Sequence, residues 1–541
     1  MPTMFYNTQR HRLEEFIPLA PGPDAADPLR GALVRMYSCG PTVYDYAHIG
    51  NFRAFLFADV LRRYLEFRQA RVHQVMNMTD VGHMTDDAVA DGAGQDKLQV
   101  AVEKMKVSKK SGRALVADPN DPFQVADFFA DVFLADARAL GLAVAADYDR
   151  AGDAAAREAV MPRPTRHIGD FIALIQQLLA KGHAYVATDG VVYYDVGSFA
   201  AYGKLSGNDL ARLAHGAGGR TNRQAAKRHP ADFFLWKPDR AHLMRWDSPW
   251  GEGYPGWHIE CSAMAMHFLG QSLDIHTGGE DNIFPHHECE IAQSEGATGK
   301  EFSRFWMHTR HLMVNGEKMS KSKGNFFTIR DLTEKGYDPL VIRYALICTR
   351  YRESSNFTLQ GLREAATAVS SLRDLADKLT LAVAAVDEAA GDGDASELAG
   401  DPGRQSAIHD VVLAPPEAAM INEFTLAMDD DLNISAALAA LFTWANPLAK
   451  KGKLAYPAAR SALAALRRVD HVLGVIFASL RALPAGVVEQ VEALMQQRRQ
   501  ARENKDFASS DALRVELSRL GVEVKDSATG SACRPRLAPP A

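Results

Sequence analysis

Cysteine is scarce in this sequence, with five residues in 541. A sparse and odd-numbered set of cysteines excludes a disulfide-stapled scaffold and indicates a reducing compartment. Runs of about 18 or more apolar residues are also lacking, which excludes membrane-spanning helices of the usual length. The N-terminal segment has no apolar core of the kind that a secretory signal peptide needs. We therefore expect a cytoplasmic protein that makes no use of a membrane.

A strong excess of charge of one sign is lacking too. Sixty-one basic residues stand against 67 acidic ones, for a net charge of -6. This balance excludes a protein held on nucleic acid by bulk charge, although a local basic face stays open. What is present is an ordinary globular composition, with 47% hydrophobic and 24% charged residues. At about 150 residues per domain, the length predicts three or four domains.

The first recognisable pattern along the chain is a strand, a helix and a second strand. Residues 33–39 alternate in the manner of a strand, apolar residues recur at helical spacing over 52–67, and a second strand-like run covers 72–78. This order predicts a βαβ unit and therefore a parallel sheet. The fold class we expect is α/β.

A long stretch of about 118–228 then interrupts the sheet pattern. It combines a helical segment over 125–140 with a hairpin predicted around Gly190. We interpret it as an insertion between two halves of a sheet domain. Strand-like runs return at 272–276 and 310–314, and each leads into a loop that contains glycine.

Beyond residue 357 the pattern becomes helical. One apolar stripe is formed by Leu359, Leu362, Ala366, Val369, Leu372 and Leu375. Residues of about 386–405 are rich in Ala, Gly, Asp and Glu and hold no aromatic residue, which predicts a flexible linker. Helical patterning resumes over 418–480, and a last segment begins near Val487.

The junction of the first strand and the first helix carries the tetrapeptide His48-Ile49-Gly50-Asn51. Amides and the dipole at a helix N-terminus favour phosphate, and a glycine lets a ligand approach the backbone closely. Taken alone, the tetrapeptide is more typical of a helix cap with a hydrogen-bonded histidine.

A glycine-bounded loop at 315–325 carries three lysines, in the run Lys318-Met319-Ser320-Lys321-Ser322-Lys323. Ammonium groups on a mobile loop can follow the charge of a triphosphate as pyrophosphate departs. The alternative is a solvated basic loop. As a pair, however, this run and the tetrapeptide at His48 resemble the signatures of class I aminoacyl-tRNA synthetases.

That resemblance implies roles for particular residues in handling ATP. His48 and Asn51 would stabilise the charged transition state at the α-phosphate, beside Gly50. Lys318 and Lys321 would hold the β- and γ-phosphates. The fourth position of the tetrapeptide is Asn51 where the family's signature has a histidine, and we expect function to survive this departure.

Three more residues follow the strand-like run at 272–276. Class I enzymes often place residues there against the ribose and adenine, which assigns Gly278, Gly279 and Asp281 to ATP. A Gly-Gly-Glu-Asp sequence is also an ordinary turn.

Four potential metal ligands lie beside these motifs: Cys39, Cys261, His286 and Glu290. His286 and Glu290 are spaced to share one face of a helix. Two thiolates, an imidazole and a carboxylate suit zinc. The spacing matches no zinc-finger pattern, so from spacing alone buried structural cysteines and a capped helix are the more ordinary explanation.

The runs at 37–45, 257–262 and 285–288 resemble the signature of the cysteinyl-tRNA synthetase family. The resemblance implies that the four residues bind one zinc ion in the amino-acid pocket. Cys289, three residues after His286, competes with Glu290 by its spacing, and the family pattern favours Glu290. Further residues would contact or orient the amino acid or support the metal ligands: Thr79, Asp80, Trp257, His258, His276, His287 and Glu288.

Zinc has a chemical purpose in such an enzyme. A zinc ion deprotonates a coordinating thiol, so that cysteine binds as a thiolate, whereas the hydroxyl of serine is a much poorer ligand. Size alone discriminates such similar side chains only about 10–200-fold. Coordination could make a separate editing site unnecessary.

The C-terminal half resembles the RNA-binding half of the same family. Residues 357–486 would form a helical tRNA-binding bundle, with 428–433 as its recognisable piece; a packing or dimerisation domain is the alternative. Residues 487–541 would form a small anticodon-binding module. Its basic residues could meet phosphates: Arg498, Arg499, Arg502, Lys505, Arg514 and Arg519. Cys533 stands where the family usually has tryptophan, so a base-stacking contact worth roughly 1–3 kcal/mol would be missing.

Together these observations predict a Rossmann-like catalytic domain over 1–356, followed by the bundle and the small module. The expected activity is formation of cysteinyl-adenylate from L-cysteine and Mg²⁺-ATP, and transfer to the terminal ribose of tRNA(Cys). We expect a monomer rather than a dimer. Two rivals are a cysteine ligase that acylates an amine on a sugar conjugate and a non-catalytic paralogue that senses cysteine or binds RNA.

Overall fold

The computed structural model describes residues 2–81, 84–86, 93–110, 116–209, 226–320, 323–390, 411–452, 454–483, 485–527 and 530–539. Two sequence predictions fall outside these ranges. They are the assignment of Lys321 to the phosphates and most of the predicted linker, residues 391–405.

A four-stranded parallel sheet forms the centre of the molecule, in the order β12-β11-β3-β4. β3 (Leu33–Ser38) pairs in register with β4 (Arg71–Met76), and α1 (Ile49–Phe67) connects them. This confirms the βαβ unit predicted from the sequence. The apolar face of α1 is buried because its large side chains recur every three or four residues.

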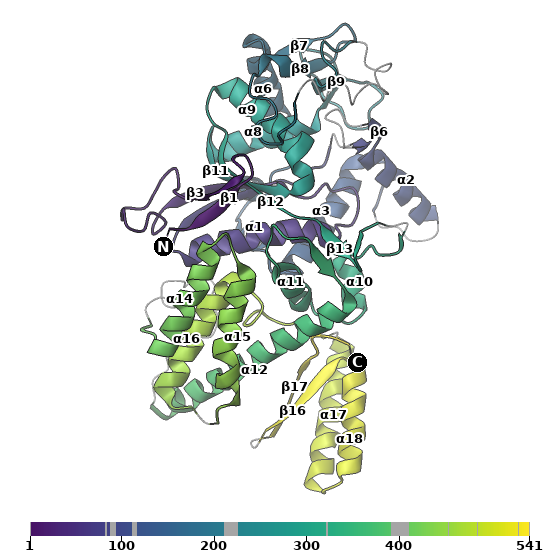
Figure 1. The fold of residues 1–541 in the computed structure, drawn as a ribbon. Coiled ribbons are helices and arrows are strands. Elements are labelled where there is room, and N and C mark those ends of the chain that lie inside the picture. The colour runs from purple at the N-terminus through teal and green to yellow at the C-terminus, as the bar shows by residue number, and fades with distance from the viewer. Residues whose placement is uncertain are drawn as a thin grey trace.

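Helices cover both faces of this sheet. α1 packs against β4, β11 and β12, and α8 packs against β3 and β4 from the other side, as Figure 1 shows. Around the sheet the structure has α8 (Trp257–Leu269), β11 (Leu273–Gly279), α9 (Glu288–Thr298), β12 (Ser303–Thr309), β13 (Leu312–Val314), β14 (Glu317–Lys318), α10 (Ile329–Glu334), α11 (Pro339–Ile347) and β15 (Ser355–Phe357).

One strand expected from the sequence divides differently. The run predicted at 310–314 contains β13, which belongs to a separate sheet with β14 and β15. The strand that completes the parallel sheet is β12, immediately before it. Because Arg310 and His311 are the only break between β12 and β13, local pattern did not separate the two strands.

Between β4 and α8 the chain leaves the parallel sheet. The predicted insertion of about 118–228 lies inside this longer excursion. The hairpin predicted around Gly190 is confirmed by β7 and β8, which pair antiparallel. The excursion contains β5 (Met84–Asp86), β6 (Ala93–Asp96), α2 (Lys97–Lys110), α3 (Pro122–Ala139), α4 (Ala143–Arg150), α5 (Ala154–Val160), α6 (Ile168–Ala180), β7 (Ala184–Val186), β8 (Val192–Tyr194), β9 (Phe233–Pro238) and β10 (Gly253–Pro255). At the N-terminus, β1 (Met4–Asn7) pairs with β2 (Arg12–Glu15).

A helical bundle follows the sheet. It consists of α12 (Leu359–Ala390), α14 (Pro415–Asp429), α15 (Ile434–Lys450) and α16 (Tyr456–Leu473). The predicted apolar stripe of α12 is buried except for Leu359, which is 38% exposed at the start of the helix. α12 continues to Ala390 and so includes the first residues of the predicted linker. Among the described residues, no helix has the length and apolar character needed to cross a membrane.

The recognisable piece of the bundle, residues 428–433, contacts the sheet half of the molecule. The Asp429 carboxylate accepts hydrogen bonds from the hydroxyls of Thr3 and Tyr64, both at 2.6 Å. The Asp431 carboxylate accepts from the Tyr351 hydroxyl and from Arg352 Nε, also at 2.6 Å. Both aspartates are buried. This piece therefore joins two parts of the chain.

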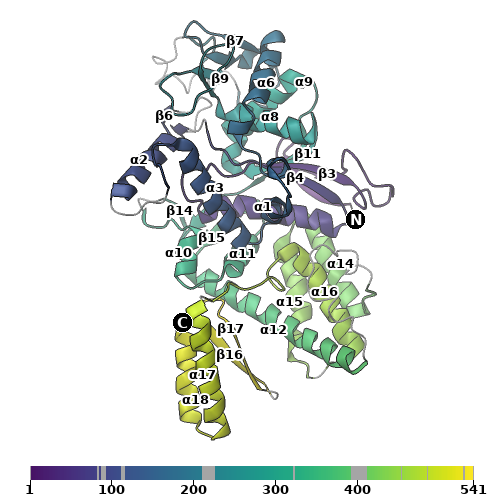
Figure 2. The same cartoon turned by 180° about the vertical axis from the view of Figure 1, so that it is seen from behind.

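The C-terminal module stands beside α12 and away from α14–α16, as Figures 1 and 2 show. It has α17 (Ala485–Glu503), α18 (Phe507–Arg519) and the antiparallel pair of β16 (Val522–Ser527) and β17 (Gly530–Pro535). Arg534 of β17 binds Asp374 of α12 at 2.7 Å, and Lys525 of β16 binds the same carboxylate.

Arg498 corrects one expectation for this module. Its guanidinium is buried and binds the Asp526 carboxylate through two nitrogens, at 2.9 and 2.8 Å. Ser531 Oγ also accepts from it, at 2.9 Å. An arginine so enclosed holds the module's helix to its strands and does not face phosphates. Cys533 lies exposed on β17.

Candidate active site and metal centre

The predicted site residues gather at the point in the parallel sheet where the order of strand addition reverses. The chain runs from β3 to β4 on one side and from β11 to β12 on the other, so the switch point lies between β3 and β11. Ligands of open α/β sheets bind at the carboxyl ends of the strands at such a point. Cys39 directly follows β3, and Gly278 and Gly279 end β11.

The N-terminus of α1 opens at the same edge. His48 is its N-cap, and His48 Nδ1 accepts a hydrogen bond from the Asn51 amide at 3.1 Å. Asn51 Oδ1 accepts in return from the His48 amide at 3.1 Å. This reciprocal cap holds both polar side chains at the positive end of the helix dipole. The helix cap that the sequence offered as an alternative is thus present at the position of the predicted anion site.

The lysine-bearing loop reaches this helix end. Met319 Cε lies so close to Gly50 that a Cβ at Gly50 would approach it to 2.9 Å. Asn325 shapes the loop, since its Oδ1 accepts from the Ser320 amide at 2.8 Å and its Nδ2 donates to the Lys318 carbonyl at 3.3 Å. The two motifs that lie far apart in the sequence are therefore in contact, and Lys318 ends the strand at the loop's base.

The four predicted metal ligands come together. One ligand atom from each of Cys39, Cys261, His286 and Glu290 lies within 4.8 Å of the others. His286 Nε2 is 3.1 Å from Glu290 Oε1, as their spacing on the chain predicted. Cys261 lies on α8, Cys39 directly follows β3, His286 precedes α9, and Glu290 lies on α9.

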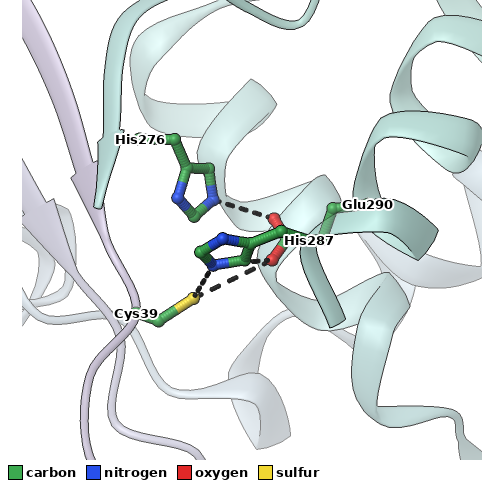
Figure 3. A group of neighbouring side chains, drawn as sticks. All are labelled: Cys39, His276, His287 and Glu290. Carbon is green, nitrogen blue, oxygen red and sulfur yellow. Dashed lines mark hydrogen bonds and ion pairs between the residues drawn. The ribbon is translucent and has the colours of Figure 1, made fainter. Parts of the chain in front are cut away.

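A second group shares two of these residues. Cys39 and Glu290 also converge with His276 and His287, again within 4.8 Å. Figure 3 shows the His276 ring directed at the Glu290 carboxylate, and the His287 ring beside both this carboxylate and the Cys39 thiol. His276 Nε2 lies 3.0 Å from Glu290 Oε2, and Cys39 Sγ lies 3.2 Å from His287 Nε2. Two overlapping sets of ligands are thus available around one carboxylate.

Aromatic and imidazole neighbours hold the histidines in place. Trp257 stacks on the His286 ring at 4.1 Å, and His258 Nδ1 lies 2.8 Å from His286 Nδ1. On the other side, His308 Nε2 lies 2.7 Å from His287 Nδ1. Such partners orient the rings of metal ligands. Sequence analysis did not single out His308, because it belongs to β12, the strand that the local pattern did not separate.

Cys289 and Glu288 have other contacts. Cys289 Sγ lies 3.5 Å from the Tyr202 hydroxyl, and the structure brings it into neither group. Glu288 accepts hydrogen bonds from the backbone amides of Gly203 and Ser206, at 2.9 and 2.8 Å. Glu288 therefore fastens the excursion to α9. The sequence had suggested instead that it supports the metal ligands.

The chemistry of the group fits a cation. Burial raises the pKa of Glu290 well above its usual range. Desolvation and the neighbouring Cys261 thiol likewise raise the pKa of Cys39 well above its usual range. Burial also lowers the pKa of His276 to about 3. Thiols, carboxyl and imidazoles that burial keeps neutral converge here, and a bound cation would stabilise the deprotonated ligands.

Thr79 and Asp80 lie beyond β4 with partners of their own. Thr79 Oγ1 accepts from Asn77 Nδ2 at 2.8 Å. Asp80 accepts from the amide and the hydroxyl of Thr165, at 3.1 and 2.7 Å. Burial raises the pKa of Asp80 to about 6. These contacts tie the end of β4 to the excursion.

Gly278 is packed against His287, a member of the second group of potential ligands. A Cβ there would lie 2.7 Å from His287 Cε1 and 3.0 Å from Asn282 Oδ1. Gly278→Ala is expected to displace the His287 ring, costing about 1–3 kcal/mol of stability and about 10–100-fold in metal affinity. Zinc titration and urea unfolding of the purified variant measure the two effects.

Gly279→Ala is the matched control, because the nearest atom to its Cβ would be 3.6 Å away. Equal metal affinity and stability in the two variants would contradict the prediction.

Asp281 lies on the same turn, is 76% exposed, and is 3.1 Å from His311 Nε2. Burial of His311 opposes its protonation less than Asp281 favours it, so the pKa of His311 is raised.

Comparison with known proteins agrees with this fold. A model of the class I (C) tRNA synthetase catalytic domain matches residues 25–367, which is more than half of the chain. A methionyl-tRNA synthetase from Mycobacterium tuberculosis, in complex with methionyl-adenylate, has a TM-score of 0.52 at 14% identity over 82% of this chain and 91% of that one. This likeness concerns the fold alone. Fold and site together define a class I aminoacyl-tRNA synthetase.

The matches in the second half are more specific. A DALR domain model matches residues 423–478, and a model of the cysteinyl-tRNA ligase anticodon binding domain matches 485–534. The cysteine–tRNA ligase of Salinibacter ruber is 40% identical over 97% of each chain. That of Symbiobacterium thermophilum is 39% identical over 98% of this chain and 99% of its own. The chain belongs to the cysteine–tRNA ligase family.

Proposed function

We propose that this protein activates L-cysteine with Mg²⁺-ATP and transfers it to the terminal ribose of tRNA(Cys). The observation that carries the proposal is the group of Cys39, Cys261, His286 and Glu290 beside the capped N-terminus of α1. A thiol-selective pocket and a phosphate site lie at one edge of the sheet. Family membership along the whole chain supports the same activity.

In the first step the cysteine carboxylate attacks the α-phosphate in line and pyrophosphate leaves. His48 and Asn51, at the positive end of α1, stabilise the charge that builds up on the α-phosphate. Lys318 and Lys321 hold the β- and γ-phosphates, and Gly50, Gly278, Gly279 and Asp281 border the nucleotide. The ribose hydroxyl then attacks the adenylate carbonyl and releases AMP. Orientation and electrostatics supply the catalysis, so no covalent enzyme intermediate is needed.

The residues of the metal group fit zinc, by their soft and borderline donor atoms. Zinc bound there would supply a direct bond to a substrate thiolate, which serine cannot match. Trp257 and His258 position His286, whereas His308 positions His287, whose Nε2 lies 3.9 Å from Glu290 Oε1. We assign these residues to the shape of the amino-acid pocket, together with Thr79 behind β4.

For the whole chain we propose a catalytic domain over 1–356, with its insertion, a tRNA-binding bundle over 357–486 and an anticodon-binding module over 487–541. The three matched family models support this division. We also propose that the protein acts as a monomer in the cytoplasm. The sparse and odd-numbered set of five cysteines supports a reducing compartment.

Cysteine-dependent ATP–pyrophosphate exchange tests the activity, run beside serine and with metal content assayed on the same sample. Exchange with cysteine alone, followed by charging of tRNA(Cys), is the expected result. Bound metal without exchange would overturn the proposal in favour of a cysteine sensor. Exchange without charging of tRNA would redirect it to a ligase with an amine acceptor.

The lysine loop offers a matched pair of variants. Lys318→Ala is expected to lower pyrophosphate exchange by about 100-fold or more, because one positioned donor to developing charge is typically worth that much. Lys323→Ala is the control, since Lys323 lies in the same loop and binds Glu317 at 2.9 Å. Similar rates in both variants would show that the loop acts only by its net charge.

A further inference from the structure

A second cluster of potential ligands lies outside the site described above, where α6 packs on α8. His167 is the residue that precedes α6, Asp170 lies in its first turn, and His267 lies in the last turn of α8. One ligand atom from each lies within 4.8 Å of the other two. Neither the proposed reaction nor the sequence motifs make use of these three residues.

Both imidazoles converge on one carboxylate oxygen. Asp170 Oδ2 lies 2.9 Å from His167 Nδ1 and 3.2 Å from His267 Nδ1. Ligand atoms that share a tetrahedral zinc ion at about 2.0–2.1 Å lie about 3.3 Å from one another. Both separations from Asp170 are thus close to this value, and the two imidazole ligand atoms lie within 4.8 Å of one another.

His167 also has the outer partner that is typical of a metal-bound histidine. Its other ring nitrogen, Nε2, lies 3.3 Å from Glu158 Oε1 on α5. Glu158 in turn accepts from the Arg163 amide and binds Arg166 Nη1, both at 2.6 Å. A carboxylate that orients the remote ring nitrogen selects the tautomer in which Nδ1 can act as a ligand.

The cluster is accessible from solvent on one side. The His167 side chain is 7% exposed, whereas those of Asp170 and His267 are 38% and 47% exposed. An ion could therefore enter from solvent and bind against one fixed and two accessible ligands.

We propose that His167, Asp170 and His267 form a second metal site, for a divalent first-row transition ion. Two imidazoles and a carboxylate suit zinc and its neighbours and do not suit Mg²⁺ or Ca²⁺, which prefer oxygen ligands. Three protein ligands leave a coordination position for water. The site is distinct from the first, because it contains no thiol and shares no residue with it.

The ion would tie the excursion to the helix that carries Cys261. Cys261 and His267 both lie on α8, about 9 Å apart along the helix axis. An ion between α6 and the last turn of α8 would hold that helix at the end opposite Trp257. The second site therefore has a structural role next to the first.

Metal stoichiometry of the full-length protein tests the proposal. After chelator treatment, the protein is dialysed against buffered Zn²⁺, and bound zinc is measured by elemental analysis. We expect two equivalents in the wild type and one in His267→Ala and in Asp170→Asn. Cys261→Ser is expected to lose the other equivalent. His471→Ala is the control: it removes a histidine that lies 3.6 Å from the Glu66 carboxylate, and it should keep both equivalents of zinc.

Substitution of Co²⁺ gives a second readout that does not depend on activity or stability. Cobalt at the first site produces thiolate charge-transfer absorption, whereas cobalt bound by His167, Asp170 and His267 adds only ligand-field bands. Loss of the second component alone in His267→Ala is the expected result. One equivalent of metal in the wild type, with His267→Ala indistinguishable from it, would overturn the proposal and leave the cluster as a hydrogen-bonded ion pair.

Discussion

Replacing Cys261 with serine is expected to lower cysteine-dependent pyrophosphate exchange by at least about 100-fold and to remove one equivalent of bound metal. Loss of a residue that orients a zinc ligand typically lowers metal affinity or activity about 10–100-fold, and loss of a ligand itself should lower them at least as much. Cys261 is buried on α8 and faces Cys39 and Glu290. Exchange and elemental analysis on the same sample measure both effects.

Cys289→Ser is the matched control for this variant. Cys289 is equally buried and adjoins Glu290 in the chain, but its sulfur contacts the Tyr202 hydroxyl. Serine can keep that hydrogen bond, so the variant should retain metal and exchange. Retention of both by Cys261→Ser, with their loss in Cys289→Ser, would contradict our assignment of the ligands.

The same experiment decides between the two overlapping groups of ligands. Cys261 and His286 belong only to the first group, and His276 and His287 only to the second. If the first group binds the ion, His276→Gln keeps the metal and loses at most the support that it gives to Glu290. Loss of metal in His276→Gln but not in Cys261→Ser would assign the ion to the second group.

The largest expected effect on stability comes from Asp59→Ala. Asp59 of α1 and Arg343 of α11 are both buried, with their charged atoms 2.6 Å apart. Arg343 also donates to the carbonyls of Leu140 and Leu473, at 3.1 and 2.6 Å. Removal of the carboxylate leaves a buried guanidinium without its counter-charge, which typically costs about 3–5 kcal/mol. Urea unfolding measures this loss.

Two further variants test the reason for this loss. Asp149→Ala breaks an ion pair with Arg138 whose side chains are both 45% exposed, and should cost no more than about 1 kcal/mol. Asp59→Ala combined with Arg343→Met removes both buried charges and should recover much of the stability. A double variant as unstable as Asp59→Ala would show that lost packing, and not the unpaired charge, is responsible.

The buried Asp59 carboxylate should also make the free energy of unfolding depend on pH under acid conditions. Burial works to raise the pKa of Asp59, but Arg63 and Arg343 together hold it below its usual value. Because the folded pKa is depressed, Asp59 stabilises the fold above its unfolded pKa of about 4, and this contribution is lost as the pH falls.

The local part of the architecture could be predicted from the sequence. The first strand, α1 and β4 have the spacing of apolar residues that such elements require, and His286 and Glu290 have the spacing of one helical face. The convergence of Cys39 with Cys261 could not be predicted from spacing, because it depends on how β3 and α8 pack. That expectation came from family resemblance.

Long-range partners account for what the sequence did not show. Arg498 looked like a surface cation because Asp526, which neutralises it, reaches it only when β16 packs on α17. Residues 428–433 identified the predicted bundle, but their sequence did not show that Asp429 and Asp431 are buried against Tyr64 and Tyr351. In both cases a charged side chain finds its partner through tertiary packing.

α12 sets a fixed distance in the molecule. As an unbroken helix of 32 residues it is about 48 Å long. It packs on α11 beside the parallel sheet, and it carries Asp374, to which Arg534 and Lys525 of the C-terminal module attach. Asp374 is 15 residues beyond Leu359, about 22 Å along the helix axis, so α12 holds the C-terminal module at its middle, about that far from the start of the helix beside α11. Salt that weakens the Asp374 attachment would loosen this spacing without changing the helix itself.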